Sequence, residues 1–146
     1  MTKPLAGKEA AEKIGTQLPQ SVVEYDDTSV FVEPNSISQA CSFLNQTPGL
    51  EFDYIDNLTA VDYLDYFEVV YHLVSLQHNH SLVLKTRLHD RENPVVPSVT
   101  NIWTGADFQE REVWDLFGIR FEGHPNLKRI LLWEGFEGHP LRRDFL

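Results

Sequence analysis

The feature that most constrains the fold is a pair of long β-forming segments that lie close together in the chain. Residues 67–76 are almost continuous in β-branched, aromatic and aliphatic side chains, which is typical of a central strand covered on both faces. Residues 81–89 alternate instead, with leucines facing one side and Lys85, Arg87 and His89 facing the other. The polar loop 77–80 has the length of a hairpin connection, so the two segments predict an antiparallel pair in the middle of a sheet.

The remaining periodicities add helices and strands around this pair. Helical spacing predicts helices over 6–17 and from 34–36 to 47, and each of them ends before a proline. Alternating segments predict strands over 21–25, 30–33, 50–54 and 58–62, with an irregularity at Asp56–Asn57. With a third helix near 107–117, the order α-β-β-α-β-β-β-α predicts an α+β fold, a two-layer sandwich with a mainly antiparallel sheet. We expect residues 1–119 to form this globular domain and 120–146 to be an extended C-terminal docking segment of the same domain.

Composition places the chain among ordinary globular proteins. Its 146 residues are enough for one core, and 42% apolar with 23% charged residues is a typical balance. No apolar run approaches the length of a transmembrane helix, and residues 1–7 lack the apolar stretch of a signal peptide. Cys41 is the single cysteine, so neither a disulfide nor a cysteine-held iron–sulfur cluster is possible within the chain. Because it lies on the apolar stripe of the second helix, we expect its thiol to be buried. Since one cysteine forms no disulfide within the chain, we expect a reducing, cytosolic compartment.

Charge is unevenly distributed along the chain. The net charge of −10 argues against nucleic acid as the main partner. Residues 1–119 carry 7 basic and 18 acidic residues, whereas residues 120–146 carry 5 and 4. The acidic body therefore ends in a mildly basic segment, which suggests a separate role for that segment.

The third helix has a clear beginning, stripe and end. Either Thr104 or Asp107 is expected to cap its first turn. Val113, Leu116 and Phe117 have the spacing of one buried stripe, and Gly118 fits the left-handed position that terminates a helix.

The other face of this helix carries an unusual concentration of charge around a tryptophan. It consists of Glu110, Arg111, Glu112, Trp114 and Asp115. One interpretation is a solvated face with local ion pairs of about 0–1 kcal/mol each. The other is a surface for a partner, because Trp and Arg are common interface anchors. The residues alone do not separate the two.

Histidines suggest metal binding only weakly. Four of them surround the central hairpin, but the turn histidines and His89 would lie roughly 25 Å apart along a strand, so one ion cannot bind them all. Gly123-His124-Pro125 and Gly138-His139-Pro140 are turn elements, with glycine for an unusual φ and proline to fix the backbone. Two histidines without a third ligand are a weak metal signal, and a hydrogen bond to neighbouring backbone or to a partner is the favoured role.

No catalytic pattern accompanies these residues. Glu110 and Glu112 point in different directions on a helix, and no nucleophile arrangement or phosphate-binding loop is present. The sequence therefore predicts no catalytic, cofactor-binding or metal-binding residue in this chain. The terminal pair Arg142-Arg143, flanked by apolar residues, suits docking into a partner better than a frayed end.

These residues resemble a known family. The pattern Glu110-Arg-Glu, Asp115-Leu-Phe, His124, Lys128 and Ile130-Leu131 is similar to the signature of the C subunit of NADH-quinone oxidoreductase, which is the thirty-kilodalton subunit of respiratory complex I. Other segments look like the family too: 58–63, 67–73, 84–87, 96–98 and 138–142. The resemblance covers roughly residues 20–146.

The resemblance implies a peripheral-arm subunit without a redox centre of its own. Its expected partners are the quinone-site subunit of the forty-nine-kilodalton type and the subunit with the terminal iron–sulfur cluster, at the cytoplasmic face of the cell membrane. FMN, iron–sulfur clusters, NADH and quinone are implied for the complex, none for this chain. The expected partner contacts are Glu110, Arg111, Glu112, Trp114, Asp115, His124, Arg129, His139, Arg142 and Arg143, with turns at Gly118, Gly123, Pro125, Gly138 and Pro140.

Many family members continue beyond the Arg-Arg-Asp-Phe motif, whereas this sequence stops at Leu146. Contacts of such a tail are expected to be absent or supplied by another subunit. The short form also leaves open an equivalent subunit of a ferredoxin-driven, other-cofactor or hydrogenase-type membrane complex. An independent metal-binding protein that uses the histidines is the alternative from another class.

Overall fold

A computed structural model of the chain describes residues 2–127 and 137–143. The helices are α1 (Gly7–Gln17), α2 (Ile37–Gln46) and α3 (Ala106–Phe117), with a 3-10 turn at Pro34–Ser36 before α2. The strands are β1 (Lys3–Pro4), β2 (Val22–Tyr25), β3 (Ser29–Val32), β4 (Tyr54–Asp62), β5 (Phe67–Ser75), β6 (His80–Leu88), β7 (Val95–Pro97) and β8 (Arg120–Glu122).

The main sheet is built around the predicted hairpin. β5 and β6 pair antiparallel from Phe67↔Leu88 to Ser75↔His80, which confirms the pairing expected from their apolar patterns. The strand order is β2-β3-β6-β5-β4, and β3 and β1 both pair with β6 in parallel. His78 and His80 therefore lie at one end of the hairpin and His89 follows the other end, as expected.

One predicted strand differs from the structure. Residues 50–53 are not a strand, and a single strand, β4, begins at Tyr54 and continues through the segment expected at 58–62. The irregularity at Asp56–Asn57 is a shift in register between Ile55 and Asn57, so the bulge bends one strand instead of separating two.

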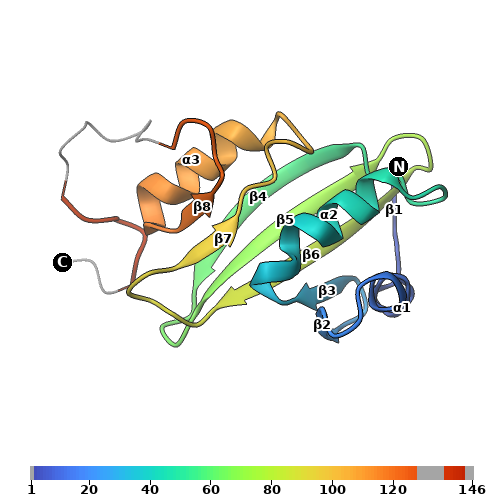
Figure 1. Ribbon diagram of the computed structural model, residues 1–146, viewed down its shortest axis with the longest axis horizontal. Helices are drawn as coiled ribbons and strands as arrows, with labels where there is room; N and C mark the ends of the chain where they lie inside the picture. Colours follow the sequence, from blue (N-terminus) through green and yellow to red (C-terminus); the bar gives the residue numbers. More distant parts are fainter. Residues whose placement is uncertain (1, 128–136, 144–146) are drawn as a thin grey trace.

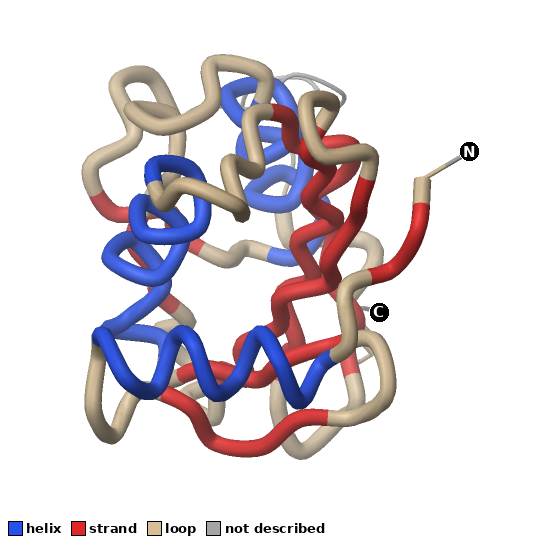
Figure 2. The backbone as a smooth tube through the Cα atoms, turned by 90° about the vertical axis from the view of Figure 1, so that its right-hand side faces the viewer, coloured by secondary structure: helices blue, strands red, loops and turns tan. Residues whose placement is uncertain are grey.

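The helices form the second layer. α2 crosses in front of the central strands, α3 lies beside the edge strand β4, and α1 lies beside β2 and β3 (Figure 1). Turned by 90°, the strands gather on one side of the view and α2 on the other (Figure 2). One buried apolar cluster joins all three helices to the sheet, which confirms the two-layer α+β sandwich. Cys41 is fully buried in that cluster, as predicted, and burial raises the pKa of its thiol.

A second, small sheet extends the domain past residue 119. β7 and β8 pair in parallel, with Val96 opposite Phe121, and the Phe121 side chain is buried. The Ser98 amide also donates to the Glu122 carbonyl. Residues 120–122, which were expected to be extended, thus pair within the globular fold. The side chains of Ile119 and Phe121 are both buried in its core.

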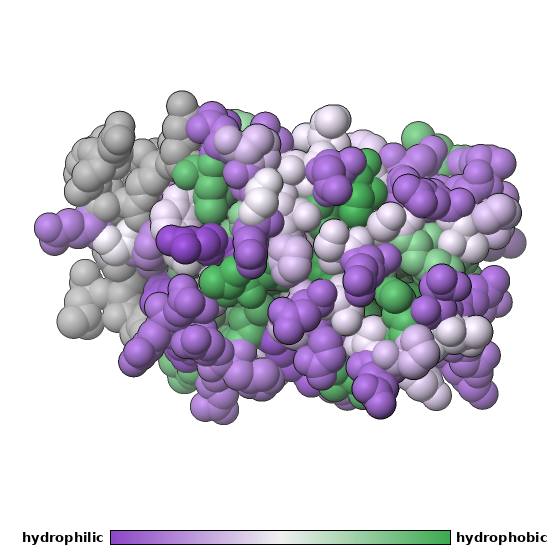
Figure 3. Space-filling model, in the orientation of Figure 1, coloured by the Kyte–Doolittle hydropathy of each residue, from purple (hydrophilic) through white to green (hydrophobic). Residues whose placement is uncertain are grey.

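The surface is mostly polar. Seen from the side of α2, polar side chains cover most of the molecule and apolar surface is divided into small patches (Figure 3). Among the described residues, no helix is both long and apolar enough to span a bilayer.

Candidate functional site: α3 and the segments that hold it

Helix α3 lies on β4, and its buried stripe contains a carboxylate. Ala106, Glu110, Val113 and Phe117 recur at helical spacing and are all buried. The Val113 and Phe117 part of the stripe was predicted, and Leu116 is half-buried beside it. Gln109 accepts a hydrogen bond from the Leu58 amide, so α3 also covers backbone of the edge strand β4.

The predicted N-cap of α3 is wrong. Gly105 precedes the helix, and no side chain caps its first turn. Asp107 has a different contact, because its Oδ1 lies 2.9 Å from Nε2 of the buried His124 ring. The Asn126 amide donates to Nδ1 of His124, so the ring carries its hydrogen on Nε2 and donates it to the Asp107 carbonyl oxygen at 3.3 Å. The turn at 123–125 is thereby attached to the N-terminal turn of α3.

Glu110 is not on the exposed face where the sequence placed it. Its side chain is fully buried, and it accepts hydrogen bonds from Ser98 Oγ at 2.7 Å and from the Val99 amide at 2.8 Å. Burial raises the pKa of this carboxyl to about 7, although both hydrogen bonds favour its ionised form. The Glu110 side chain thus joins α3 to the end of β7, and its expected contact with a partner stays a prediction.

Asp115 is buried too. Residues 137–143, here called the C-terminal strap, contact the backbone at the end of α3. The strap hydrogen-bonds three of the carbonyls that a helix leaves unpaired in its last turn. His139 Nδ1 donates to Asp115 O at 2.9 Å, the Leu141 amide to Leu116 O at 2.9 Å, and Arg142 Nε to Phe117 O at 2.6 Å.

His139 and Arg142 were expected to contact a partner, and instead they cap α3 within the chain. Hydrogen bonding of the turn histidines to neighbouring backbone, the role favoured from the sequence, is confirmed for His139. It is supported for His124, whose Nε2 lies 3.3 Å from Asp107 O. The two Gly-His-Pro turns therefore hold opposite ends of one helix.

Asp62 anchors the strap to the sheet, and sequence reasoning did not identify it. Arg91 donates to both carboxylate oxygens, at 2.6 and 3.0 Å, and the Arg143 amide donates to Oδ2 at 2.8 Å. Burial opposes the charge of Asp62, but the Arg91 and backbone hydrogen bonds outweigh it and lower its pKa to about 2. Arg91 and Arg142 also lie over the Phe67 ring, with the guanidinium carbons 4.4 and 5.0 Å from its centroid.

The predicted turn glycines have the left-handed backbone expected of them. Gly118, Gly123 and Gly138 have φ values of 79°, 87° and 85°. At Gly118 space is limiting as well, because a Cβ there would lie 2.7 Å from His139 Cδ2. Pro125 is exposed and Pro140 half-buried in their turns.

The other expected partner contacts remain available. Glu112 and Arg143 are exposed, Arg111 is half-buried, and the half-buried Trp114 ring lies 5.3 Å from the His139 ring. Arg129 lies outside the described residues. Partner binding by these side chains stays a prediction.

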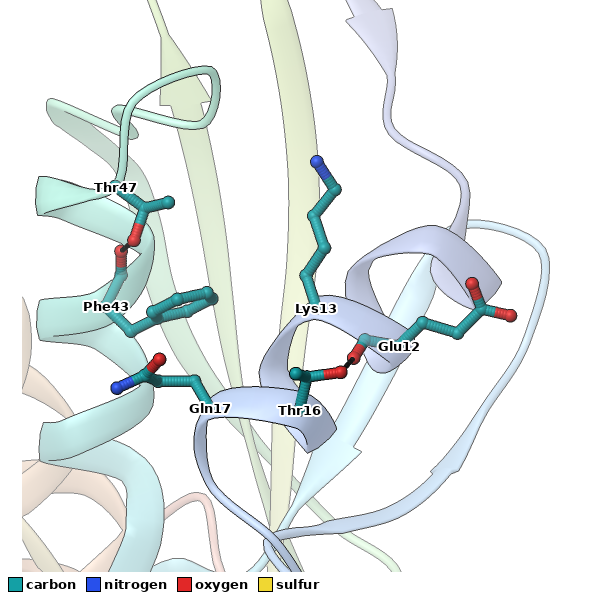
Figure 4. A pocket seen from close by; sticks show the side chains of 6 residues that line it. All are labelled: Glu12, Lys13, Thr16, Gln17, Phe43 and Thr47. Carbon is teal, nitrogen blue, oxygen red and sulfur yellow. Dashed lines mark hydrogen bonds between the residues drawn. The ribbon is translucent and has the colours of Figure 1, made fainter.

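A hollow of about 360 Å³ lies away from α3, between α1 and α2. Phe43 points from α2 toward α1, whereas the Glu12 side chain points away (Figure 4). Thr16 and Thr47 each donate to a carbonyl one turn earlier in their own helices, so their hydroxyls are already used. The residues around α3 offer the stronger site, because both Gly-His-Pro turns converge on that helix.

Comparison with known proteins agrees with this fold. A chain in the structure of the membrane-bound sulfane sulfur reductase (MBS), an archaeal respiratory membrane complex, superposes with a TM-score of 0.76 at 25% identity, covering 94% of this chain and 84% of that one. The fold is therefore one found in respiratory membrane complexes.

Sequence comparison identifies the family. Residues 30–146 match the model for the respiratory-chain NADH dehydrogenase 30 Kd subunit, and the chain belongs to that family. The C subunit of NADH-quinone oxidoreductase from a Roseiflexus species (strain RS-1) is 46% identical over 91% of this chain and 80% of its own length. The corresponding C 2 subunit of Rhizobium meliloti is 50% identical over 78% of this chain, and the match spans 63% of that relative.

Proposed function

We propose that the chain is a structural, non-redox subunit in the peripheral arm of an NADH-quinone oxidoreductase at the cytoplasmic face of the cell membrane. It docks on the quinone-site subunit of the forty-nine-kilodalton type and lies near the subunit that holds the terminal iron–sulfur cluster. Family membership and the names of the relatives support this assignment.

One observation carries the proposal: the family signature builds a helix that is held at both ends. His124 attaches to the first turn of α3, and the strap caps the last turn. Glu110 and Asp62, the two most perturbed carboxyls of this region, are both used in internal hydrogen bonds. Such a helix suits a rigid docking element, because little conformational entropy remains to be lost on binding.

Rigidity is the contribution proposed for this subunit. FMN, iron–sulfur clusters, NADH and quinone belong to the other subunits in this proposal, and electrons pass among them without using this chain. Electron transfer between fixed centres, and a quinone chamber that excludes water, both require the subunits around them to keep their positions. The chain therefore supports the reaction by fixing two neighbours against each other.

The test uses a bacterial host in which the gene for its own thirty-kilodalton subunit is deleted. A tagged copy of this chain should restore NADH-quinone reductase activity in membranes and should co-purify with the quinone-site and iron–sulfur subunits. The isolated chain should oxidise no NADH. Purification without any subunit of the complex, at normal expression of the chain, would overturn the proposal.

A second candidate rests on the structural neighbour in the archaeal complex. In that case the same docking role belongs to a membrane complex with another electron donor, such as ferredoxin. Identities of 46–50% to NADH-quinone oxidoreductase subunits, against 25% to the archaeal chain, favour the first candidate. Supplying NADH or reduced ferredoxin to the complex purified from the source organism separates the two.

A further inference from the structure

An exposed aromatic marks the outward face of α3. Phe108 is 56% exposed, whereas Val113 and Phe117 of the same helix are buried. Thr104 is exposed one turn before it. A large aromatic on a rigid helix is the type of residue that supplies most of the binding energy in protein interfaces.

Two hollows flank Thr104. One, of about 380 Å³, is lined by Thr100, Asn101, Thr104, Asp107, Gly123 and Pro125. The other, of about 390 Å³, includes Asp53 and the half-exposed Tyr54. Thr104 lines both hollows, and each hollow has an aspartate in its wall.

Charge in these hollows has one sign. Asp107 and Asp53 are their charged residues, and among the described residues neither hollow is lined by Lys or Arg. The Asp107 side chain is 48% exposed, and its Oδ1 faces His124, so within residues 2–127 and 137–143 its Oδ2 is open to another donor. Glu122 is exposed next to Gly123 and adds to the negative potential. Acidic walls in a recess attract a cationic side chain more strongly than the same charges on a flat surface.

The walls are fixed before anything binds. His124 holds Asp107, and Glu110 holds the Ser98–Val99 backbone that leads into Thr100. Trp103 Nε1 donates to Phe52 O at 3.0 Å, which fixes the segment before Thr104. A recess of this kind loses little entropy when a side chain enters it.

We propose that the Thr104–Phe108 surface, meaning Thr104, Phe108 and the hollow beside Asp107, docks a basic segment of a partner protein. A lysine or arginine of that segment enters the hollow toward Asp107, and its apolar neighbours cover Phe108. The occupant is a protein and not a small cation, because Phe108 offers apolar contact beside the acidic recess. This inference rests on the proposed function, which makes the partner a subunit of the same complex.

The test introduces a positive or a negative charge at Thr104. In the deletion host, tagged full-length chains carry Thr104→Lys, Thr104→Glu, Phe108→Ala or the control Val23→Ala, whose apolar side chain is 53% exposed on β2, at the opposite edge of the sheet from β4. The measurement is the amount of quinone-site subunit recovered per tagged chain. Thr104→Lys and Phe108→Ala should lower recovery about tenfold or more, while Thr104→Glu and Val23→Ala should stay within about twofold of wild type.

Each other outcome contradicts a defined part of the proposal. If Thr104→Lys and Thr104→Glu lower the recovery of the quinone-site subunit equally, while the midpoints of their urea unfolding are unchanged, the occupant is not basic. Normal recovery for Thr104→Lys and Phe108→Ala would mean that nothing docks there. If the wild-type chain recovers no subunit of the complex, the proposed function fails and this inference fails with it.

Discussion

At the scale of single residues, Glu110 shows how a charged side chain can serve the core. It occupies a core position of α3, and its carboxylate accepts hydrogen bonds from two donors at the end of β7. A buried polar group is tolerated only when such partners are present. Its burial also makes the stability of the fold depend on pH.

Glu110 should make the chain less stable as pH rises from about 4.5 to about 7. Its carboxyl loses a proton near 4.5 when unfolded but only at about 7 when folded, so the folded state binds the proton more tightly in that interval. The contribution is present below pH 4.5 and is lost as pH passes 7, with a size on the order of 3 kcal/mol. Urea unfolding of wild type and Glu110→Gln at several pH values measures it.

The free energy of unfolding of Glu110→Gln should change less with pH over the same interval, because the glutamine amide does not titrate. Asp62 does not interfere, since its lowered pKa of about 2 confines its own effect to acidic solution below about pH 4, where stability falls as the pH falls. Identical pH profiles for wild type and Glu110→Gln would rule out the assignment.

At the scale of elements, the C-terminal strap completes α3. Gly118 ends the helix and its amide donates to the Trp114 carbonyl, while strap residues cap the next three carbonyls. Helix and strap therefore depend on each other, although more than twenty residues of chain separate them. The terminal arginines have different roles in this arrangement.

Arg142 and Arg143 should respond differently to replacement by alanine. Arg142→Ala removes the donor to Phe117 O and the contact with Phe67, and should lower the free energy of unfolding by about 1–3 kcal/mol. Arg143→Ala keeps the backbone bond to Asp62 and loses only an exposed side chain, so we expect a change within about 0.5 kcal/mol. Urea unfolding compares the two, and hydrogen exchange of the Leu141 amide reports on the strap. Equal effects of the two variants would contradict the capping role.

At the scale of the whole molecule, one layer of helices covers one face of the sheet, and α3 presents Phe108 and its acidic hollows outward. The contacts that hold the two ends of α3 lie within the chain, whereas the Thr104–Phe108 surface is exposed. Assembly defects should accordingly be of two kinds, which temperature can separate.

In the deletion host, Arg142→Ala should reduce assembled complex at 37 °C and recover toward wild type at lower growth temperature, because its defect is in the stability of the subunit. Thr104→Lys should remain defective at both temperatures, because its defect is in contact with the partner. Native gel electrophoresis of solubilised membranes measures the assembled complex. Recovery of both variants to the same extent would show that the Thr104–Phe108 surface acts through stability.

Much of the fold was predictable because apolar periodicity reports directly on burial. The β5–β6 hairpin, the three helices and the buried Cys41 all follow from local spacing. Gly118 was predictable for a similar reason, since a left-handed residue at a helix end favours glycine. The sequence showed an irregularity at the β4 bulge, but it did not show that one strand continues through it. Pairing with β5 decides whether the strand continues.

The roles of the charged residues were decided only by tertiary structure. Sequence alone determined that Glu110, Asp115, His139 and Arg142 are polar, and polar residues are usually exposed. The structure buries Glu110 and Asp115 and half-buries His139 and Arg142. The ends of β7 and α3 leave donors and carbonyls that must be paired when buried, and Glu110, His139 and Arg142 supply partners for them. Those partners lie 12 to 25 residues away in the chain for the Glu110–Ser98 and Arg142–Phe117 bonds, a separation at which no local pattern reports contact.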